Sequence, residues 1–351
     1  MNVVELKEVC NTLTNFVPIV SVRPLTDLVA LATQNGYLYL AHTDKDNATI
    51  IGKVKCSTEI KPTVVSLSKL FSLVKLTTKE TVKLTRKDDY VEFKGNGIYK
   101  IRIQLDEMGN EFALPINIPN KPTTMHTITT KDIHSIFTRC SFLIDENNMP
   151  EMLCTYYSDG IRTVTTNSIA VASINHNLGI TEINPRMMKS LMAIPDDFEI
   201  GAVDCGYRIA NDTYSAVYRV ENSDTFPKDI VMPFITDMAR YSCSVNVDKK
   251  ALLDSLKREL VFKNSFEPLI SYLTFNSNCV KLENKEKDFF EEIPCNGTAN
   301  GRHIVVDTER LINIAKHLDD NIVIYIGDVA ICLEDSLGKY VLASADEKGN
   351  D

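Results

Sequence analysis

The side chains that most often perform catalysis are present in this sequence, but their spacing matches none of the common catalytic or metal-binding patterns. The six histidines show no H-x-H or H-x-x-x-H spacing, and the nine cysteines form no C-x-x-C pair. The chain has no G-x-x-x-x-G-K-[ST] loop, no G-x-G-x-x-G turn and no G-x-S-x-G turn. We therefore expect no catalytic residues, no metal and no cofactor. An enzyme with catalytic residues dispersed along the chain stays open as an alternative.

One chemistry that the sequence can support is the attraction of phosphates by lysine and arginine. The net charge of −9 argues against a general basic coat. Six segments with helical spacing nevertheless carry a net positive charge together: residues 4–16, 66–78, 130–140, 184–194, 248–260 and 307–318. If all six faced one cavity, its wall would attract a polyanion while the exterior repelled it. The alternative is that Lys and Arg are simply good helix formers on solvated faces.

Each helical segment is followed by three strand-like runs. The clearest case is residues 151–174, where short runs alternate apolar and polar side chains from Leu153 onward and Asp, Gly, Asn and Ser separate them. Asn184-Pro185 then opens the next helix, as an N-cap followed by proline at the first helical position. The pattern predicts an antiparallel meander that leads into a capped helix. The other predicted caps are Ser66, Thr130, Asp248 and Asp307.

The pattern repeats three times, with a period of about 120 residues that is long enough for a domain. The first helices begin near Val4, Thr130 and Asp248, and the second helices near Ser66, Asn184 and Asp307. We therefore expect an α+β fold of three similar domains, each with two helices and antiparallel sheets. The expected domains are residues 1–122, 123–240 and 241–351. The alternative is an unrelated α+β protein whose elements happen to be evenly spaced.

The composition indicates a soluble globular protein, with 44% hydrophobic and 24% charged residues. No apolar run approaches the roughly 20 residues that a membrane helix needs. The N-terminus lacks the basic region of a signal peptide. An odd number of cysteines without paired spacing predicts reduced thiols in the core. We expect a cytoplasmic protein without a membrane partner.

Four segments resemble the bacterial-type β sliding clamp, the DNA polymerase III β subunit that makes replicative polymerase processive. Residues 161–167 and 169–171 look like the middle-domain segment L-R-T-V-A-T-D-G-H-R-L-A-V of that family. Residues 226–227 with 231–233 are similar to F-P-D-Y…V-L-P, and residues 340–342 to Y-V-V-M-P-M. Arg23-Pro24 stands where the family has Arg-Pro near its first helix. The similarity covers the whole chain in order.

The resemblance implies a three-domain protomer that dimerises head to tail into a ring around double-stranded DNA, without sequence readout. Such a ring does no chemistry and needs no cofactor, because it acts by tethering the replicative DNA polymerase and other replication proteins to DNA. A separate clamp loader would open it. The expected location is a bacterial or infected-host cytoplasm, associated with the nucleoid. The divergence from the family favours a phage or other mobile element as the source.

The resemblance also implies site residues. The DNA-binding cations would be Arg23, Lys69, Lys75, Lys131, Arg139, Arg186, Lys189, Lys249, Lys250, Lys257, Arg310 and Lys316. The pocket for partner peptides would use Met149, Thr166, Ser168, Ile169, Pro227, Val231, Val329, Val341, Leu342, Ala343 and Ser344. The dimer interface would place Ile101 and Ile103 of one protomer beside Val261 and Phe262 of the other.

The sequence departs from the family at the pocket. Asn167-Ser168 replaces Asp-Gly, the following His-Arg pair is missing, and residues 343–345 read Ala-Ser-Ala instead of Met-Pro-Met. We therefore expect a pocket that is shallower or differently shaped. Two other readings stay open: a β-rich oligomeric structural protein that does not encircle DNA, and the dispersed-site enzyme, which predicts a deep pocket with perturbed carboxylates.

Overall fold

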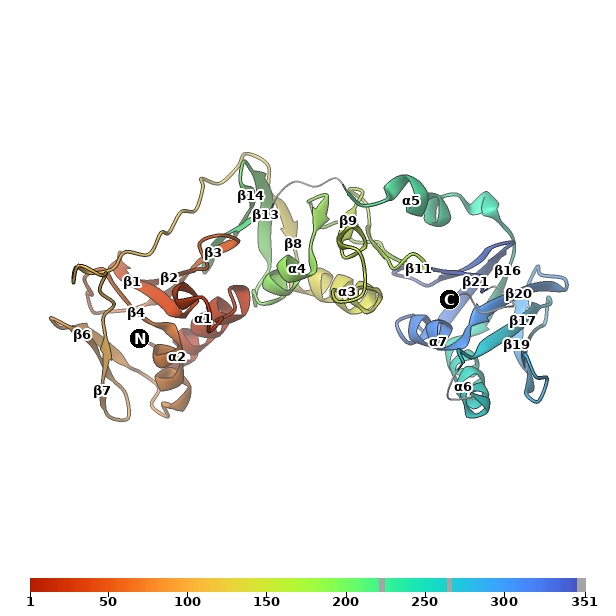
Figure 1. The fold of residues 1–351 in the computed structure, drawn as a ribbon, viewed down its shortest axis with the longest axis horizontal. Helices are drawn as coiled ribbons and strands as arrows, with labels where there is room; N and C mark the ends of the chain where they lie inside the picture. Colours follow the sequence, from red (N-terminus) through yellow and green to blue (C-terminus); the bar gives the residue numbers. More distant parts are fainter. Residues whose placement is uncertain (221–224, 264–266, 346–351) are drawn as a thin grey trace. The chain divides into compact units, whose positions relative to one another are not determined.

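The computed structural model describes residues 1–220, 225–263 and 267–345, which form two compact units. The first unit comprises Met1–His134, Leu178–Ile180 and Arg186–Ser223. The second comprises Ser135–Asn177, Thr181–Pro185 and Asp224–Asp351. Both are built from antiparallel sheets with helices packed on them (Figure 1). The predicted α+β class is therefore confirmed, whereas the three-domain division at residues 122 and 240 stays a prediction.

The first unit contains an eight-stranded antiparallel sheet in the order β4-β1-β2-β3-β15-β14-β13-β8 and a three-stranded sheet, β5-β6-β7. Its helices are α1 (Val3–Phe16), the 3-10 turn η1 (Pro24–Asp27), α2 (Leu67–Leu76) and most of α4 (Pro185–Met192). Its strands are β1 (Leu28–Gln34), β2 (Tyr37–Thr43), β3 (Ala48–Lys55), β4 (Thr63–Ser66), β5 (Lys83–Arg86), β6 (Tyr90–Lys94), β7 (Ile98–Arg102), β8 (His126–Ile128), β13 (Phe198–Val203), β14 (Gly206–Ala210) and β15 (Tyr214–Arg219). Helix α3 (Thr130–Cys140) starts in this unit and ends in the second.

The second unit contains a twelve-stranded sheet in the order β12-β9-β10-β11-β23-β22-β21-β16-β19-β18-β17-β20. Its helical elements are η2 (Ser141–Leu143), η3 (Glu151–Leu153), α5 (Lys228–Thr236), η4 (Met238–Arg240), α6 (Lys249–Glu259), η5 (Leu260–Phe262) and α7 (Thr308–Lys316). Its strands are β9 (Tyr156–Ser158), β10 (Thr163–Thr166), β11 (Ala170–Ile174), β12 (Glu182–Ile183), β16 (Tyr241–Asp248), β17 (Ile270–Phe275), β18 (Cys279–Asn284), β19 (Phe290–Gly297), β20 (Arg302–Asp307), β21 (Asn321–Gly327), β22 (Ala330–Glu334) and β23 (Gly338–Ala343).

The order of elements confirms the predicted repetition. In the described part of the chain, α1, α2, α3, α4, α6 and α7 are each followed by three strands that pair in sequence. The sequence did not predict the strand that precedes most of these helices, namely β4, β8, β12, β16 and β20. These strands lead directly into the helix caps, so the repeated unit is a strand, a helix and a three-stranded meander.

Capping explains where the helices begin. The side chains of Ser66, Asp248 and Asp307 each accept a hydrogen bond from the backbone N–H three residues later, as predicted. The prediction of Thr130 as a cap is wrong, because the helix already includes Thr130 and the hydroxyl of Thr129 accepts the bond from the Asp132 N–H. Leu153, predicted to start a strand, lies in η3 instead, and the strand begins at Tyr156.

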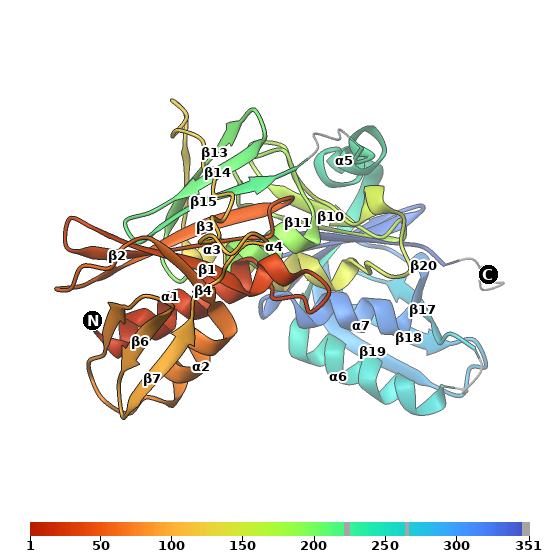
Figure 2. The same cartoon turned by 60° about the vertical axis from the view of Figure 1, so that its left-hand side comes forward.

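Each unit has a core of aliphatic and aromatic side chains between helices and sheet. In the first unit α1 buries Leu6, Leu13 and Phe16 while it packs on β3 and α2 (Figure 2). In the second unit α6 and α7 lie side by side and bury Leu252, Leu256 and Leu311 among others. All nine cysteines are free thiols, as predicted, but only five of them are buried, and the predicted core location is wrong for Cys56, Cys205, Cys243 and Cys279.

Helix α5 was not predicted, because a proline inside a segment normally argues against a helix and this one contains Pro233. The helix starts directly after Pro227 and contains Pro233, whose ring leaves one helical N–H missing. Burial of Val231 and Ile235, one turn apart, explains why the segment is helical despite that loss.

Candidate functional site

Helix α2 presents two of the predicted phosphate-binding cations to solvent. Its buried face is formed by Leu67, Leu70 and Val74, so Lys69 and Lys75 lie on the opposite, exposed face. No described carboxylate forms an ion pair with either lysine, and the Lys75 ammonium lies 5.0 Å from the centre of the Phe71 ring. Both ammonium groups are therefore available to a polyanion.

Helix α4 and the start of α3 carry three more exposed cations. The buried residues of α4 are Met187, Met188 and Leu191, and Arg186 and Lys189 are exposed beside them. The Ser190 hydroxyl donates to the Phe16 carbonyl, which ties α4 to the end of α1 within the first unit. Lys131 is exposed in the first turn of α3.

Arg23 lies in a tight turn after α1 that a buried threonine holds in place. The Thr26 hydroxyl donates to the Arg23 carbonyl at 2.7 Å and accepts from the Val20 N–H at 2.8 Å. Thr26 is almost fully buried, whereas Arg23 and Val22 are exposed. The turn therefore presents a cation and an apolar side chain from a fixed backbone.

Arg139 does not fit the predicted role in DNA binding. Its guanidinium donates to both carboxylate oxygens of Asp335, at 2.7 and 3.0 Å, and to Asp319 at 3.0 Å. Burial opposes its positive charge, but the bond to Asp335 outweighs that effect and the pKa of Arg139 is raised. The arginine is buried and holds the end of α3 to the loops before β21 and after β22, so it cannot also bind a phosphate.

Lys249 is also engaged within the second unit. Its ammonium donates to the carbonyls of Lys316 and Leu318 at the C-terminal end of α7, where the helix dipole favours a cation. Arg310 lies 3.7 Å from the Asp307 carboxylate that caps its own helix. Lys250, Lys257 and Lys316 are exposed, and these three are the stronger candidates for phosphate contacts in this unit.

The structure brings several of the predicted peptide-pocket residues together where β11 and β22 begin and β23 ends. The Ala343 N–H donates to the Ile169 carbonyl, and the Ser344 N–H donates to the Val329 carbonyl. Val231 of α5 packs in one apolar cluster with Val341, and Pro227 begins that helix. The partners Ala170 and Leu342 pair across β11 and β23, which aligns these segments.

Not every predicted pocket residue is at the surface. Thr166, Val341 and Leu342 are buried in the sheet and do not reach its surface. The exposed members of the predicted set include Ser168, Ile169 and Val329, and the α5 residue Ile230, which the sequence did not indicate, is also exposed. The contacts of Met149 lie within its own loop: its sulfur accepts from the Asp145 N–H.

Ser168 stands in the left-handed region of backbone space, with φ of +75°. A side chain there is strained, and a glycine at this position would not be. The side chain of Asn167 stabilises the turn by accepting from the N–H groups of Ile169 and Ala170. The Asn-Ser turn therefore keeps the tight geometry that an Asp-Gly turn would adopt.

An open cavity of about 600 Å³ lies between α2 and β7 in the first unit. Ser72 and Leu73 line it from the helix, and Ile98, Tyr99 and Ile101 line it from the strand. Ile101 is only 2% exposed and forms the floor, whereas Ile98 and Tyr99 are exposed at the rim. This groove includes one of the two residues that the sequence assigned to the first half of the dimer interface; Ile103 follows β7 and is half-buried.

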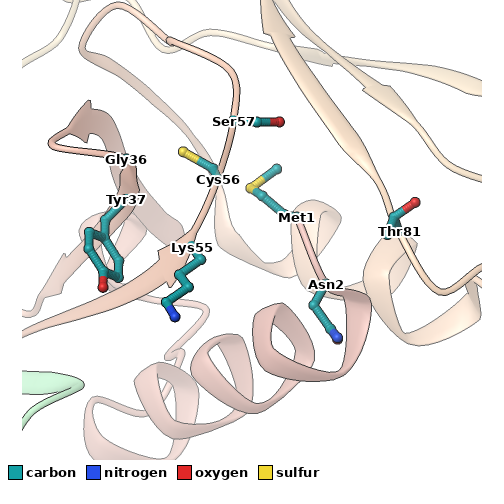
Figure 3. Close-up of a pocket in the computed structure, with 8 residues that line it drawn as sticks. All are labelled: Met1, Asn2, Gly36, Tyr37, Lys55, Cys56, Ser57 and Thr81. Atoms are coloured by element: carbon teal, nitrogen blue, oxygen red, sulfur yellow. The ribbon is translucent and has the colours of Figure 1, made fainter.

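A second open cavity, of about 430 Å³, is lined by Tyr37, Lys55, Cys56 and the first two residues of the chain among others (Figure 3). Its lining contains neither a histidine nor a carboxylate. Glu259 has a strongly raised pKa but is fully buried and lines neither cavity. No group of three or more potential metal ligands lies together among residues 1–220, 225–263 and 267–345.

No helix in the described part of the chain is long and apolar enough to cross a membrane.

These features define the fold of a β sliding clamp. The DNA polymerase III β subunit of Thermotoga maritima superposes with a TM-score of 0.76 at 16% sequence identity, over 99% of this chain and 98% of that chain. The β subunit of Pseudomonas aeruginosa gives a TM-score of 0.78 at 15% identity, over 99% of both chains. The β chain of Streptococcus pneumoniae gives 0.77 at 14%, over 98% of both. No protein-family model and no curated protein matches the sequence. The resemblance inferred from the sequence is thus confirmed for the fold.

Proposed function

We propose that the protein is a DNA sliding clamp: a non-enzymatic processivity factor that encircles duplex DNA and tethers the replicative DNA polymerase and other replication proteins. The observation that carries the proposal is the likeness in fold to DNA polymerase III β subunits along 99% of the chain. Exposed lysines and arginines on α2, α4 and α6 of an acidic protein support it, because such cations attract phosphates without reading sequence. In this proposal the chain has three domains and acts in the cytoplasm.

The proposed DNA-facing set follows from the contacts described above. Arg139 is omitted because Asp319 and Asp335 bind it, and Lys249 is omitted because it caps α7. The remaining members are Arg23, Lys69, Lys75, Lys131, Arg186, Lys189, Lys250, Lys257, Arg310 and Lys316.

A closed ring requires a second copy, and two free sheet edges support that step. Strand β7 is an edge of its three-stranded sheet and exposes Lys100 and Arg102. In the described residues β16 covers only the C-terminal end of β19, so the part containing Glu291 and Glu292 is also an edge. Unpaired edge strands are suited to pair with each other through their backbone groups.

Apolar side chains beside each edge supply the second part of this interface. Val261 is 81% exposed and Phe262 is 40% exposed on η5, next to β19 in the second unit. We propose that these side chains of one protomer enter the groove between α2 and β7 of another, against Ile101 and Ile103. Charge alone gives little affinity in water, so the apolar contact would supply most of it.

The exposed rim of Ser168, Ile169 and Val329, with α5 beside it, is the proposed docking surface for short peptides of the polymerase and the clamp loader. Apolar anchors such as Leu and Phe suit this surface, because its floor is an apolar cluster that includes Val231 and Val341. The Ala343 and Ser344 side chains are small, which favours a shallow pocket.

The proposal is tested by loading the protein onto nicked circular DNA with a clamp loader and then linearising the DNA. A clamp stays on the circle in high salt and slides off after linearisation. An oligomeric structural protein shows no retention on the circle. A protein that stays bound after linearisation holds DNA by direct contact and is not a sliding ring.

The proposed interface has its own test. Phe262→Glu should give monomers in analytical ultracentrifugation, because a carboxylate cannot be buried in the apolar groove without a large cost. Glu286→Gln, an exposed change in the turn before β19, is the matched control and should leave the dimer intact. A Phe262→Glu protein that sediments as a dimer contradicts the assignment.

A further inference from the structure

Glu259, the last residue of α6, is a buried carboxyl group with an incomplete set of partners. It is 0% exposed. Its Oε2 accepts a hydrogen bond from the Ser271 hydroxyl of β17 at 2.5 Å, and that hydroxyl lies 2.7 Å from the Thr308 hydroxyl at the start of α7. Its Oε1 has no hydrogen-bond partner among the described residues. The group therefore joins three elements through hydroxyls alone.

No cation in the described chain compensates a negative charge at this position. The charged residues of the surrounding elements bind one another instead: Arg258 with Glu291, Lys263 with Glu309, and Asp307 with Arg310, while Asp288 beside β17 bonds Asn284. The carbonyl end of α6 adds further negative potential. Burial raises the pKa of Glu259 to about 7, although the nearby hydroxyls of Ser271 and Thr308 oppose the rise.

Glu259 also stands directly before η5, which carries Val261 and Phe262. Because α6 ends at this carboxyl group, its contacts with β17 and α7 fix the point from which η5 projects. An ionised Glu259 with one unpaired oxygen would gain free energy if the end of α6 moved and admitted water.

We propose that Glu259 is a proton-dependent anchor for η5: its protonated carboxyl keeps α6, β17 and α7 closed and holds Val261 and Phe262 in place, and loss of the proton favours local opening of that segment. This part of the inference concerns the second unit alone. A weaker contact between protomers at higher pH would follow for ring closure, and this consequence rests on the proposed function.

Proton linkage fixes the sign of the pH effect on this opening. The closed form holds its proton up to about pH 7, whereas an opened, hydrated carboxyl loses it near the ordinary value of 4.5. Raising the pH between these values therefore favours opening by about tenfold per pH unit. Below that range both forms are protonated and above it both are ionised, so the effect stops at either end.

Hydrogen exchange of the Leu260, Val261 and Phe262 amides, corrected for the intrinsic exchange rate, measures this opening. In the unmodified protein the opening constant should rise about tenfold from pH 5.5 to 6.5 and level off above about pH 7. Glu259→Gln should show no such slope, and Glu286→Gln should behave like the unmodified protein. An equal slope in Glu259→Gln, or no slope in the unmodified protein, overturns the proposal.

Two further measurements keep the proposal testable if Glu259→Gln folds poorly. The carboxyl carbon signal of Glu259 in the unmodified protein should titrate near pH 7 in NMR, and a midpoint near 4.5 would refute the anchor. Ser271→Ala should move this midpoint upward, because it removes a donor to the ionised form; an unchanged midpoint would contradict the assigned contact.

Sedimentation at pH 5.5 and 7.5 then tests the link to ring closure. The dimer should dissociate more readily at pH 7.5 in the unmodified protein than in Glu259→Gln. If the chain is monomeric at both values while exchange shows the slope, the anchor holds and the proposed self-association fails. If the dimer forms and exchange shows no slope, the anchor fails and the proposed function is untouched.

Discussion

The helices of the two units use similar cations in different ways. In the first unit Lys69 and Lys75 extend from α2 without a carboxylate partner in the described chain. In the second unit Arg139 is buried between two aspartates, and Lys249 caps a neighbouring helix. A lysine or arginine at a helical position therefore does not by itself indicate phosphate binding, because groups that are distant in sequence decide whether its charge is free.

The largest expected effect on stability comes from removing Asp335, the main partner of Arg139. Asp335→Ala should lower the free energy of unfolding by roughly 3–5 kcal/mol, because it leaves a buried guanidinium without its carboxylate. Urea unfolding measures the loss. The matched control is Asp328→Ala, which removes an exposed pair with Arg302 and should cost less than about 1 kcal/mol. Equal losses in the two variants would show that Arg139 is not a structural cation.

The exposed cations should act on DNA and not on stability. Lys75→Gln combined with Lys131→Gln should lower the slope of log affinity against log salt by about 2, since each phosphate contact contributes about 0.9. Retention on nicked circular DNA across a salt series gives this slope. Lys83→Gln with Lys94→Gln, which removes the same charge from β5 and β6, should leave the slope unchanged. If both pairs weaken retention alike, the effect comes from net charge and not from the helices.

A substitution of Lys249 should change stability and not DNA binding. Lys249→Met removes the cation that binds the carbonyl end of α7 and should cost about 1 kcal/mol in urea unfolding. The salt dependence of DNA retention should stay the same. If Lys249→Met lowers the slope of log affinity against log salt without a loss of stability, Lys249 belongs to the DNA-facing set.

The smallest expected effect concerns Arg310, which is exposed but lies near its own cap. Asp307→Asn keeps an N-capping side chain and removes the charge that faces Arg310. Stability should fall by about 0.5 kcal/mol or less. The salt slope should steepen slightly as Arg310 becomes available, and a slope that becomes shallower would contradict its place in the DNA-facing set.

Local patterns in the sequence were sufficient to predict the repeated helix and meander. The alternation around residues 163–174 and the caps Ser66, Asp248 and Asp307 each depend on a few adjacent residues, and all of them are confirmed. Helix α5 was missed because a proline normally ends a helix, and here burial of Val231 and Ile235 outweighs that tendency.

The fate of individual cations could not be predicted in the same way. The partners of Arg139 lie 180 and 196 residues away in sequence, so no local pattern predicts them. The peptide pocket stays a prediction, and what the structure shows is that two of the segments behind it, residues 170–171 and 341–342, pair in the sheet. Glu259 was missed entirely, since a glutamate near the end of a helix normally lies in solvent.

The pairing of β11 with β23 has a consequence for the synthesis of the protein. Val171 pairs with Val341 in this ladder, so the partner strand of β11 is synthesised about 170 residues after β11. At a translation rate of ~5–20 residues per second, this is a delay of roughly 10–30 s. During that time β9, β10 and β11 expose an unpaired apolar edge, the kind of surface on which nascent chains aggregate. The part of the long sheet that contains β9, β10 and β11 can join the rest only when β23 has left the ribosome, so we expect this unit to depend on chaperones more than a protein with local strand pairing would.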